Sequence, residues 1–215
     1  MANGLLKQTQ YQQGVLMRIA QFVILAVMAV FLSGCGINNV PTYQQAMNAK
    51  WGEVQNQYQR RADLVPNLVE TVKGYAAQEK DVLTAVVEAR AKATQMTLPA
   101  DIINNPEAFK KYQDAQGQLS QALGKLLSIT EAYPDLKSNQ NFLALQSQLE
   151  GTENRIAVSR KDYIEAVQVY NTELVTIPGR WWAYWFYPTA KPAETFAAAP
   201  GSDTAPKVDF NKPKA

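Results

Sequence analysis

Four carboxylates in the second half of the chain are the side chains best placed to do chemistry. Glu150 and Glu153 are three residues apart, which puts them on one face of a helix, and Glu131 and Asp135 precede them. Carboxylate oxygens are the ligands that Mg²⁺ and Ca²⁺ prefer, so a metal site between helices is one interpretation. A pair of glutamates at helical spacing has little specificity by itself, however.

Composition removes several kinds of site. The chain of 215 residues contains no histidine, and its only cysteine is Cys35. Di-metal sites built on Glu-x-x-His pairs, histidine-based triads and disulfides within one chain are therefore excluded. No Gly-rich loop precedes a helix, and no motif sets a base beside a serine or threonine. The net charge of +2 and the scattered basic residues argue against a nucleic-acid partner, and no cofactor is predicted.

A structural interpretation of the same carboxylates is favoured. Arginines elsewhere in the helical patterns supply guanidinium groups that pair with carboxylates between helices: Arg60, Arg61, Arg155 and Arg160. Three asparagines are predicted to be polar groups at core positions that fix the register of the helices: Asn67, Asn154 and Asn171. Together with the four carboxylates they form the predicted structural polar network.

The elements that position these groups are long amphipathic helices. Apolar residues recur at steps of three and four from near Tyr43 to Val86, from Phe109 to Thr130, and from Phe142 to Leu174. No stretch alternates with period two for long enough to predict a sheet. Short connections make neighbouring helices antiparallel, so the fold class is all-α, an antiparallel up-and-down bundle of three to four long helices.

Pro66 decides between three helices and four. The first pattern is about 50 residues long, far beyond a typical globular helix, and Pro66 breaks the backbone hydrogen-bond ladder at its centre. No loop-forming residues surround Pro66, so we expect a bend there, which gives three helices. A reversal would give four.

The amino-terminal part has the pattern of a membrane-targeting segment. Residues 17–35 begin with Met17 and Arg18, continue through an apolar stretch at 22–32 and end in Leu-Ser-Gly-Cys. The segment resembles a bacterial lipoprotein signal, which implies that Cys35 is acylated and becomes the new amino terminus. The alternative is an uncleaved transmembrane helix. In both cases Arg18 stays in the cytoplasm and the domain lies across the membrane.

Segments without helical periodicity flank the predicted bundle, which spans residues 43–179. Residues 1–16 either lie upstream of a true start at Met17 or form a poorly ordered extension, and residues 36–42 form a tether. Residues 189–215 are too poor in apolar side chains to fold alone, so a disordered tail is expected. Within that tail, residues 208–210 (Val-Asp-Phe) are a candidate docking motif.

Residues 180–188 are rich in aromatic side chains. The aromatics are Trp181, Trp182, Tyr184, Trp185, Phe186 and Tyr187. Tryptophan and tyrosine favour membrane–water boundaries, so a second membrane contact or a partner-binding patch is one interpretation. The other is a segment that folds back and seals the end of the bundle. With four helices this segment returns to the membrane anchor, whereas with three it lies far from it.

Three blocks of sequence resemble the signature of the LemA family. They are RRADLVPNLVETVKGY at 60–75, EAYPDLK at 131–137 and LEGTENRIA at 149–157, and the ending PKVDF at 206–210 is also similar. The resemblance implies an amino-terminal membrane segment and an extra-cytoplasmic antiparallel helical bundle. It implies no established biochemical activity. Cys35 in a lipoprotein-type signal departs from the single-pass pattern of many members.

The function predicted from the sequence is that of a membrane-anchored, extra-cytoplasmic scaffold or adaptor of the bacterial cell envelope, without catalytic activity of its own. The alternative is a carboxylate-based, metal-dependent binding module or a hydrolytic enzyme. The expected partners are the membrane and envelope proteins, with a homo-oligomer as one option. Gly36 after Cys35 favours the outer membrane, without deciding between the two membranes.

Overall fold

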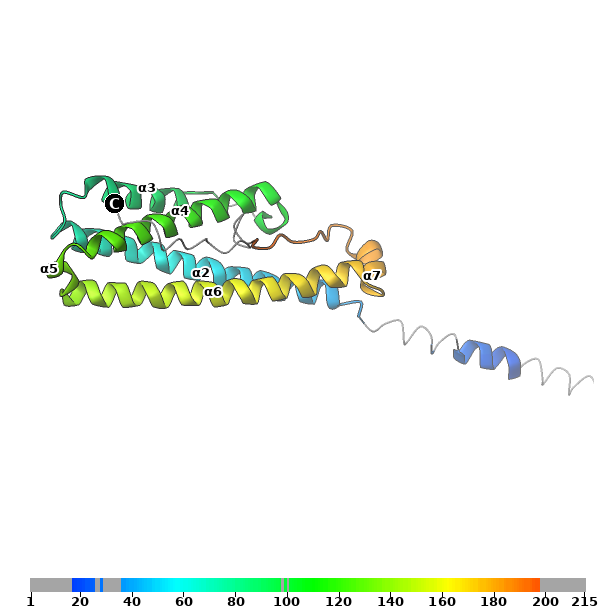
Figure 1. Ribbon diagram of the computed structural model, residues 1–215. Coiled ribbons are helices and arrows are strands. Elements are labelled where there is room, and N and C mark those ends of the chain that lie inside the picture. The colour runs from blue at the N-terminus through cyan, green and yellow to red at the C-terminus, as the bar shows by residue number, and fades with distance from the viewer. Residues whose placement is uncertain (1–16, 26–27, 29–35, 98, 100, 198–215) are drawn as a thin grey trace, which may run out of the picture. The chain divides into compact units, whose positions relative to one another are not determined.

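The computed structural model describes residues 17–25, 28, 36–97, 99 and 101–197, and within them every regular element is a helix. The elements are α2 (Asn39–Lys73), α3 (Lys80–Thr94), η1 (Ile102–Asn104), α4 (Pro106–Thr130), α5 (Pro134–Lys137), α6 (Gln140–Val175) and α7 (Gly179–Phe186) (Figure 1). The prediction of an all-α helical bundle is confirmed.

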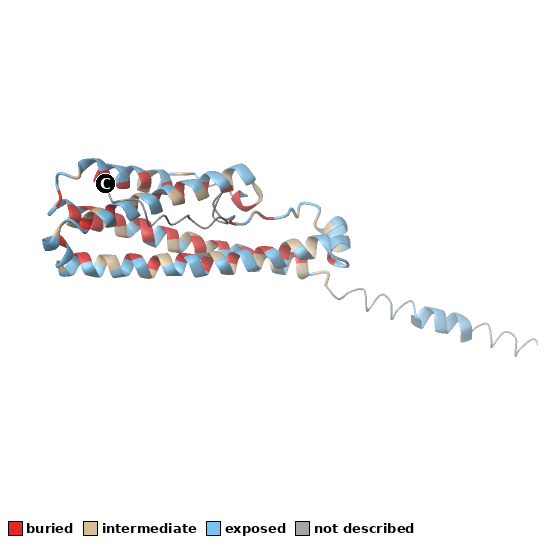
Figure 2. Ribbon diagram, in the orientation of Figure 1, coloured by how far each residue is buried: buried red, intermediate tan, exposed pale blue. Residues whose placement is uncertain are grey.

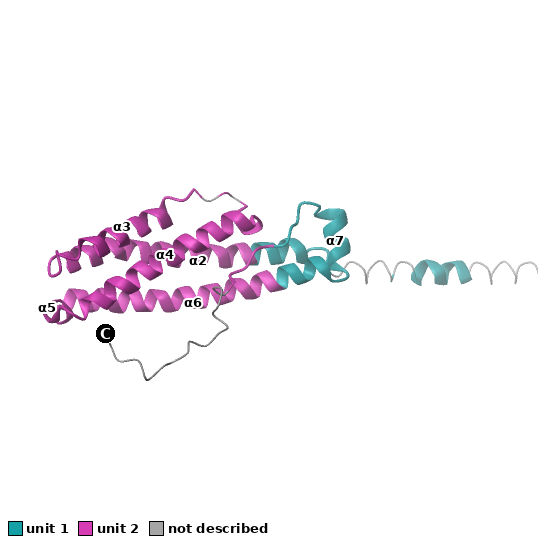
Figure 3. Cartoon of the chain, turned by 45° about the horizontal axis from the view of Figure 1, so that its top comes forward, with its two compact units in different colours: residues 1–46, 169–192 teal, residues 47–168, 193–215 magenta. Residues whose placement is uncertain are grey.

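The chain divides into two compact units, which Figure 3 colours separately. The described part of unit 1 comprises residues 17–25, 28, 36–46 and 169–192. Unit 2 comprises the described residues of 47–168 together with 193–197. The divisions fall within α2 and α6.

Unit 2 is an up-and-down arrangement of four long helices, α2, α3, α4 and α6 (Figure 1). The chain reverses at residues 74–79, and α3 then runs back along α2, where Arg90 Nε donates a hydrogen bond to the Ala62 carbonyl at 2.8 Å. The expectation of one helix running from near Tyr43 to Val86 is therefore wrong. Four long helices, rather than three, form the bundle.

The reversal occurs at Gly74 and not at Pro66 for a physical reason. Pro66 lies inside α2 on its exposed side, where the loss of one backbone hydrogen bond is tolerated. Glycine has a much lower helix propensity than alanine, and Gly74 directly follows the last residue of α2. Ala76, which is fully buried, then anchors the turn against the core.

The core of unit 2 follows the apolar stripes that the sequence predicts. Buried residues line the inward faces of all four long helices (Figure 2). One cluster of the core is mainly aliphatic and includes Val65, Leu68, Val86, Leu119 and Leu126. A smaller aromatic cluster is described below with the candidate site.

Unit 1 joins the beginning of α2 to the end of α6. Val40 and Tyr170 are buried, and Asn39 Nδ2 donates a hydrogen bond to Glu173 Oε1 at 3.2 Å. Because α2 begins at Asn39, the predicted tether at 36–42 is shorter than expected. Gly36 has a φ of 104°, a left-handed conformation that glycine adopts without strain.

The predicted disordered tail needs a correction in its first part. Residues 189–197 have no regular secondary structure, yet Ala193 and Phe196 are buried. Phe196 packs into the core, although the composition of the tail as a whole is poor in apolar residues. The candidate docking motif at 208–210 lies outside the described residues.

At the amino terminus, residues 17–25 are helical and exposed. Among the helices that the structure describes, none has both the length and the apolar character needed to cross a membrane. Residues 1–16 and Cys35 lie outside the described residues. The membrane-targeting segment at 17–35 therefore stays a prediction.

Candidate functional site: a groove above Arg61

Unit 2 contains a groove of about 860 Å³ between α2, α4 and α6. One end of it is bordered by residues 193–197, here called the strap. Beyond the strap the groove continues along α4, where Gly117, Ser120 and Gln121 line it. A Cβ built on Gly117 would meet no atom within 4 Å, so the space above this position is open.

Arg61 is the buried charge of this groove, with an exposed fraction of only 1%. Its Nη1 donates to Ser120 Oγ at 2.6 Å and to Glu153 Oε1 at 3.0 Å. Its Nη2 donates to the backbone oxygen of Gln116 at 3.1 Å and to Oε1 of the same residue at 2.7 Å. The guanidinium also lies 5.0 Å from the centre of the Tyr58 ring. One side chain of α2 thus connects α4 and α6.

Gln116 extends this network to a fourth helix. It is buried, and its Nε2 donates to the Ala93 carbonyl of α3 at 3.4 Å. Sequence reasoning missed Gln116, although a signal existed. The apolar stripe of α4 runs Phe109, Tyr112, Leu119, and its steps of three and four leave Gln116 at the vacant core position.

Aromatic rings form the wall beneath the strap. Phe196 packs with its ring centre 5.1 Å from that of Phe109 and 5.7 Å from that of Tyr163. Trp51 lies 5.3 Å from Tyr163, and the guanidinium of Arg160 lies 4.4 Å above the Phe196 ring. The strap therefore inserts one aromatic side chain into a cluster built by α2, α4 and α6.

Hydrogen bonds along the strap fix its main chain. The Glu194 N–H donates to the Ile103 carbonyl at 2.7 Å, and Tyr163 Oη donates to the Glu194 carbonyl at 2.7 Å. Gln113 Nε2 donates to the Ala197 carbonyl at 3.1 Å. The partners lie on η1, α6 and α4, so three elements hold the strap on unit 2.

Burial keeps the tyrosines of this region protonated. Desolvation raises the pKa of Tyr58, Tyr112 and Tyr163 above the usual value for a phenol. A general base is most effective with a pKa near the operating pH. These phenols are shifted in the opposite direction, and they act here as neutral packing and hydrogen-bonding groups.

The four predicted carboxylates are not brought together. Glu131 pairs with Lys137, Glu150 accepts a hydrogen bond from Gln146 at 3.0 Å, and Asp135 is exposed. Among the residues that the structure describes, no group of three His, Cys, Asp or Glu side chains is arranged to hold a metal ion. Of the four carboxylates, Glu153 is the one that joins the buried network.

The other predicted polar residues divide between surface and interface. Arg60, Asn67 and Asn154 are exposed, because they lie off the buried stripes of α2 and α6. Asn171 is half-buried. Arg155 bridges Thr152 and Gln57 with bonds of 3.0 and 3.2 Å, and Arg160 stacks on the strap instead of joining Arg61. The expectation of core asparagines at 67 and 154 is wrong, because both side chains are exposed. The buried polar residues of α6 are Thr152 and Ser159.

The predicted aromatic segment forms α7. Trp181, Tyr184, Trp185 and Phe186 are exposed, whereas Trp182 and Tyr187 are half-buried. The segment belongs to unit 1 and takes no part in the groove.

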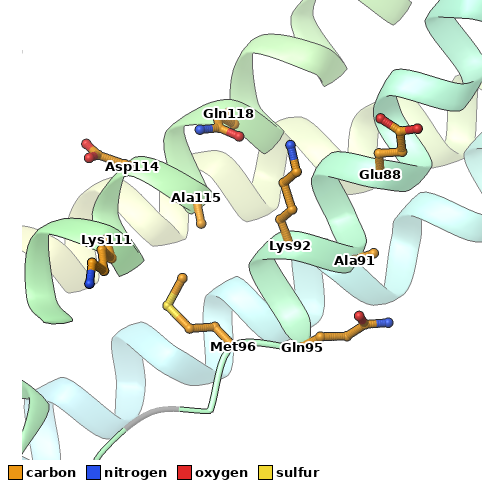
Figure 4. A pocket seen from close by; sticks show the side chains of 9 residues that line it. All are labelled: Glu88, Ala91, Lys92, Gln95, Met96, Lys111, Asp114, Ala115 and Gln118. Carbon is orange, nitrogen blue, oxygen red and sulfur yellow. The ribbon is translucent and has the colours of Figure 1, made fainter.

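A second hollow of about 720 Å³ lies between α3 and α4 (Figure 4). Glu88 and Lys92 line it from α3, and Lys111 and Asp114 from α4. All four of these side chains are exposed, and their charges balance. This second hollow lacks buried polar groups such as Arg61 and Gln116. We therefore take the groove above Arg61 as the candidate site.

Comparison with known proteins places the chain. The sequence pattern that defines the LemA family matches residues 50–210. The chain belongs to the LemA family. The resemblance seen in the sequence blocks is confirmed.

Similar proteins include three magnetosome proteins. Magnetosome proteins MamQ 2 and MamQ 1 of Paramagnetospirillum magneticum are each 28% identical over 206 residues, which covers 88% of this chain and 74% of each relative. Magnetosome protein MamQ of Magnetospirillum gryphiswaldense is 26% identical over 182 residues, covering 77% of this chain and 65% of the relative.

The LemA-type blocks meet in the structure. The block at 60–75 carries Arg61, and the block at 149–157 carries its partner Glu153. The block at 131–137 closes the end of unit 2, where Tyr133 Oη donates to Glu79 Oε1 at 2.8 Å and Leu136 is fully buried. In this family member the blocks are therefore positions that hold the four helices together.

Arg61→Ala should lower the free energy of unfolding by about 2–4 kcal/mol, because it leaves a cavity and an unsatisfied buried amide at Gln116. Arg60→Ala is the matched control, since Arg60 is exposed, and should change it by no more than about 0.5 kcal/mol. Arg61→Met, which refills the space without a charge, should cost less than the alanine variant. Chemical denaturation measures all three, and equal values for Arg61→Ala and Arg60→Ala would contradict the assigned role.

Alkaline pH should destabilise the bundle through its buried phenols. The unfolded chain releases tyrosine protons near pH 10, whereas burial raises the pKa of Tyr163 in the folded chain. The stabilisation is therefore complete below about pH 10 and is lost as the pH rises further. Tyr163→Phe should flatten the fall in unfolding free energy between about pH 9 and 11. Tyr184→Phe, at an exposed ring, is the control, and equal slopes for the two variants would refute the effect.

Proposed function

We propose that this protein is a membrane-anchored scaffold or adaptor that displays its helical bundle on the extra-cytoplasmic side of a bacterial cell envelope. It binds other proteins rather than transforming a substrate. The anchor is residues 17–35, either through an acylated Cys35 or as an uncleaved apolar helix. Family membership supports the bundle, and the relatives' name ties those proteins to the magnetosome.

The binding role is supported chiefly by the way in which the strap lies on unit 2. An extended piece of chain already lies on unit 2, held by main-chain hydrogen bonds and by one aromatic side chain inserted between rings. This combination of backbone hydrogen bonds with a side-chain pocket is a general way to recognise an extended peptide. Along α4 the same groove stays open and is lined by the polar residues Gln118, Ser120 and Gln121, so an extended segment of a partner protein is its proposed occupant.

The polar groups of the groove fit this role. Gln118 and Gln121 are exposed on α4, and their amides can donate to and accept from a partner's main chain. Beneath them, Arg61 and Gln116 are buried, and hydrogen bonds join them to each other and to Ser120, Glu153 and Ala93, although Arg61 Nε has no hydrogen-bond partner. The floor of the groove is therefore a rigid frame, and its rim is the part available for contact.

A photo-crosslinking residue placed at Gln121 tests the proposal in intact cells. Irradiation should give a discrete larger adduct, because Gln121 lines the groove. The same residue at Gln148, exposed on α6, is the control and should give no adduct. Gly117→Gln should reduce the Gln121 adduct, since it fills the groove at a position with room for a side chain.

Two outcomes would contradict the proposed docking groove or its position. Absence of an adduct at Gln121, or the same adducts from both positions, would argue against a docking groove. An adduct that Gly117→Gln leaves unchanged would place the contact elsewhere on the bundle.

A further inference from the structure

We propose that one face of α7 lies in the membrane interface, as a second contact with the bilayer that carries the anchor. The inference rests on the membrane anchoring proposed above and adds an orientation to it. The partner is the boundary between lipid headgroups and acyl chains.

The contact face is a row of exposed side chains on one side of α7. Arg180, Trp181, Tyr184 and Trp185 have the spacing of a single helix face, and together with Ile177, which precedes the helix, they line one shallow surface hollow. Their apolar members are strongly exposed, from 51% for Trp181 to 78% for Tyr184. So large an exposed aromatic patch marks an interaction site on a water-soluble unit.

The start of α7 packs against the end of α6 in unit 1. Gly179 is buried, and a Cβ on it would collide with the backbone oxygen of Glu173, so α7 begins in direct contact with α6. Trp182, on the side away from the exposed row, is half-buried. The helix is held in place by one side and presents the other outward. The sequence interpretation in which this segment seals the bundle applies only to the side that carries Trp182.

The same unit contains the point at which the chain arrives from its anchor. A Cβ on Gly36 would lie 3.9 Å from Pro178, the residue before α7. The predicted apolar stretch ends at Leu32, and four residues span at most about 14 Å. If Cys35 carries the acyl chains, the separation is a single residue. Both modes of anchoring therefore bring α7 to the membrane surface.

The chemistry of the face fits a bilayer better than a second protein. Tryptophan and tyrosine combine an apolar ring with a polar edge, which suits the headgroup region. Arg180 extends from the same face, and a long basic side chain reaches lipid phosphates while its stem stays apolar. No acidic side chain lines this described hollow, so nothing on it repels an anionic headgroup.

Fluorescence quenching in vesicles tests the contact with the full-length chain. The protein is reconstituted in phosphatidylcholine–phosphatidylglycerol vesicles, with or without a lipid brominated near the top of its acyl chains. Flotation of the vesicles measures anchoring separately. We expect brominated lipid to quench part of the tryptophan emission, and the double variant Trp181→Phe/Trp185→Phe to lose most of that quenching. Phenylalanine keeps the face apolar, so the variant removes the reporter rather than the contact.

Trp51→Phe is the matched control. Trp51 belongs to the buried aromatic cluster of unit 2, so its removal should raise the quenched fraction. Flotation without quenching from Trp181 and Trp185 would overturn the α7 contact and leave the anchor standing. Failure to float would overturn the anchor and this inference together. Cross-linking of α7 to a second copy, without quenching, would assign the face to self-association instead.

Discussion

The guanidinium of Arg61 must find both its counter-charge and its hydrogen-bond acceptors inside the protein, because it has almost no contact with water. It finds the charge on Glu153 of α6 and the acceptors on Gln116 and Ser120 of α4. A stripe of aliphatic side chains tolerates small sliding movements between helices, whereas this set of bonds has one register. Desolvation offsets much of the gain from such a pair, so we assign to it the specificity of the helix arrangement more than net stability.

A frame held in register gives the rest of unit 2 something fixed to build on. Tyr58 beside Arg61 contacts Tyr112, which in turn contacts the aromatic cluster of Trp51, Phe109 and Tyr163, and Phe196 packs into that cluster from near the carboxyl terminus. The strap therefore binds a surface that is already formed by the helices. The open continuation of the groove is rigid for the same reason, which lowers the entropic cost of holding an extended partner.

The sequence predicted the helices well and the polar site only in part. Periodicity identified the buried faces, and Asn105 caps α4 with Pro106 at its first position, as local helix chemistry requires. The reversal after α2 was missed: the sequence favours one helix bent at Pro66, because a single glycine such as Gly74 is a weak signal for a turn. The sequence named both Arg60 and Arg61 without separating them. A buried arginine is distinguished by its partners on other helices, and the sequence does not show which residues of other helices lie beside it. Phe196 was not recognised as a core residue, because the mean composition of residues 189–215 is poor in apolar side chains and hides the single phenylalanine that packs into the core.

The proposed function depends most on where the bundle is displayed and how it is held there. Protease added outside intact spheroplasts, followed by mass spectrometry of the membrane-bound amino-terminal peptide, measures both. The proposed anchoring predicts a bundle that is cleaved from outside and a peptide that either begins at an acylated Cys35 or retains the uncleaved apolar stretch before it. A protein protected from the protease and recovered in the cytosolic fraction with an unmodified amino-terminal segment would contradict it.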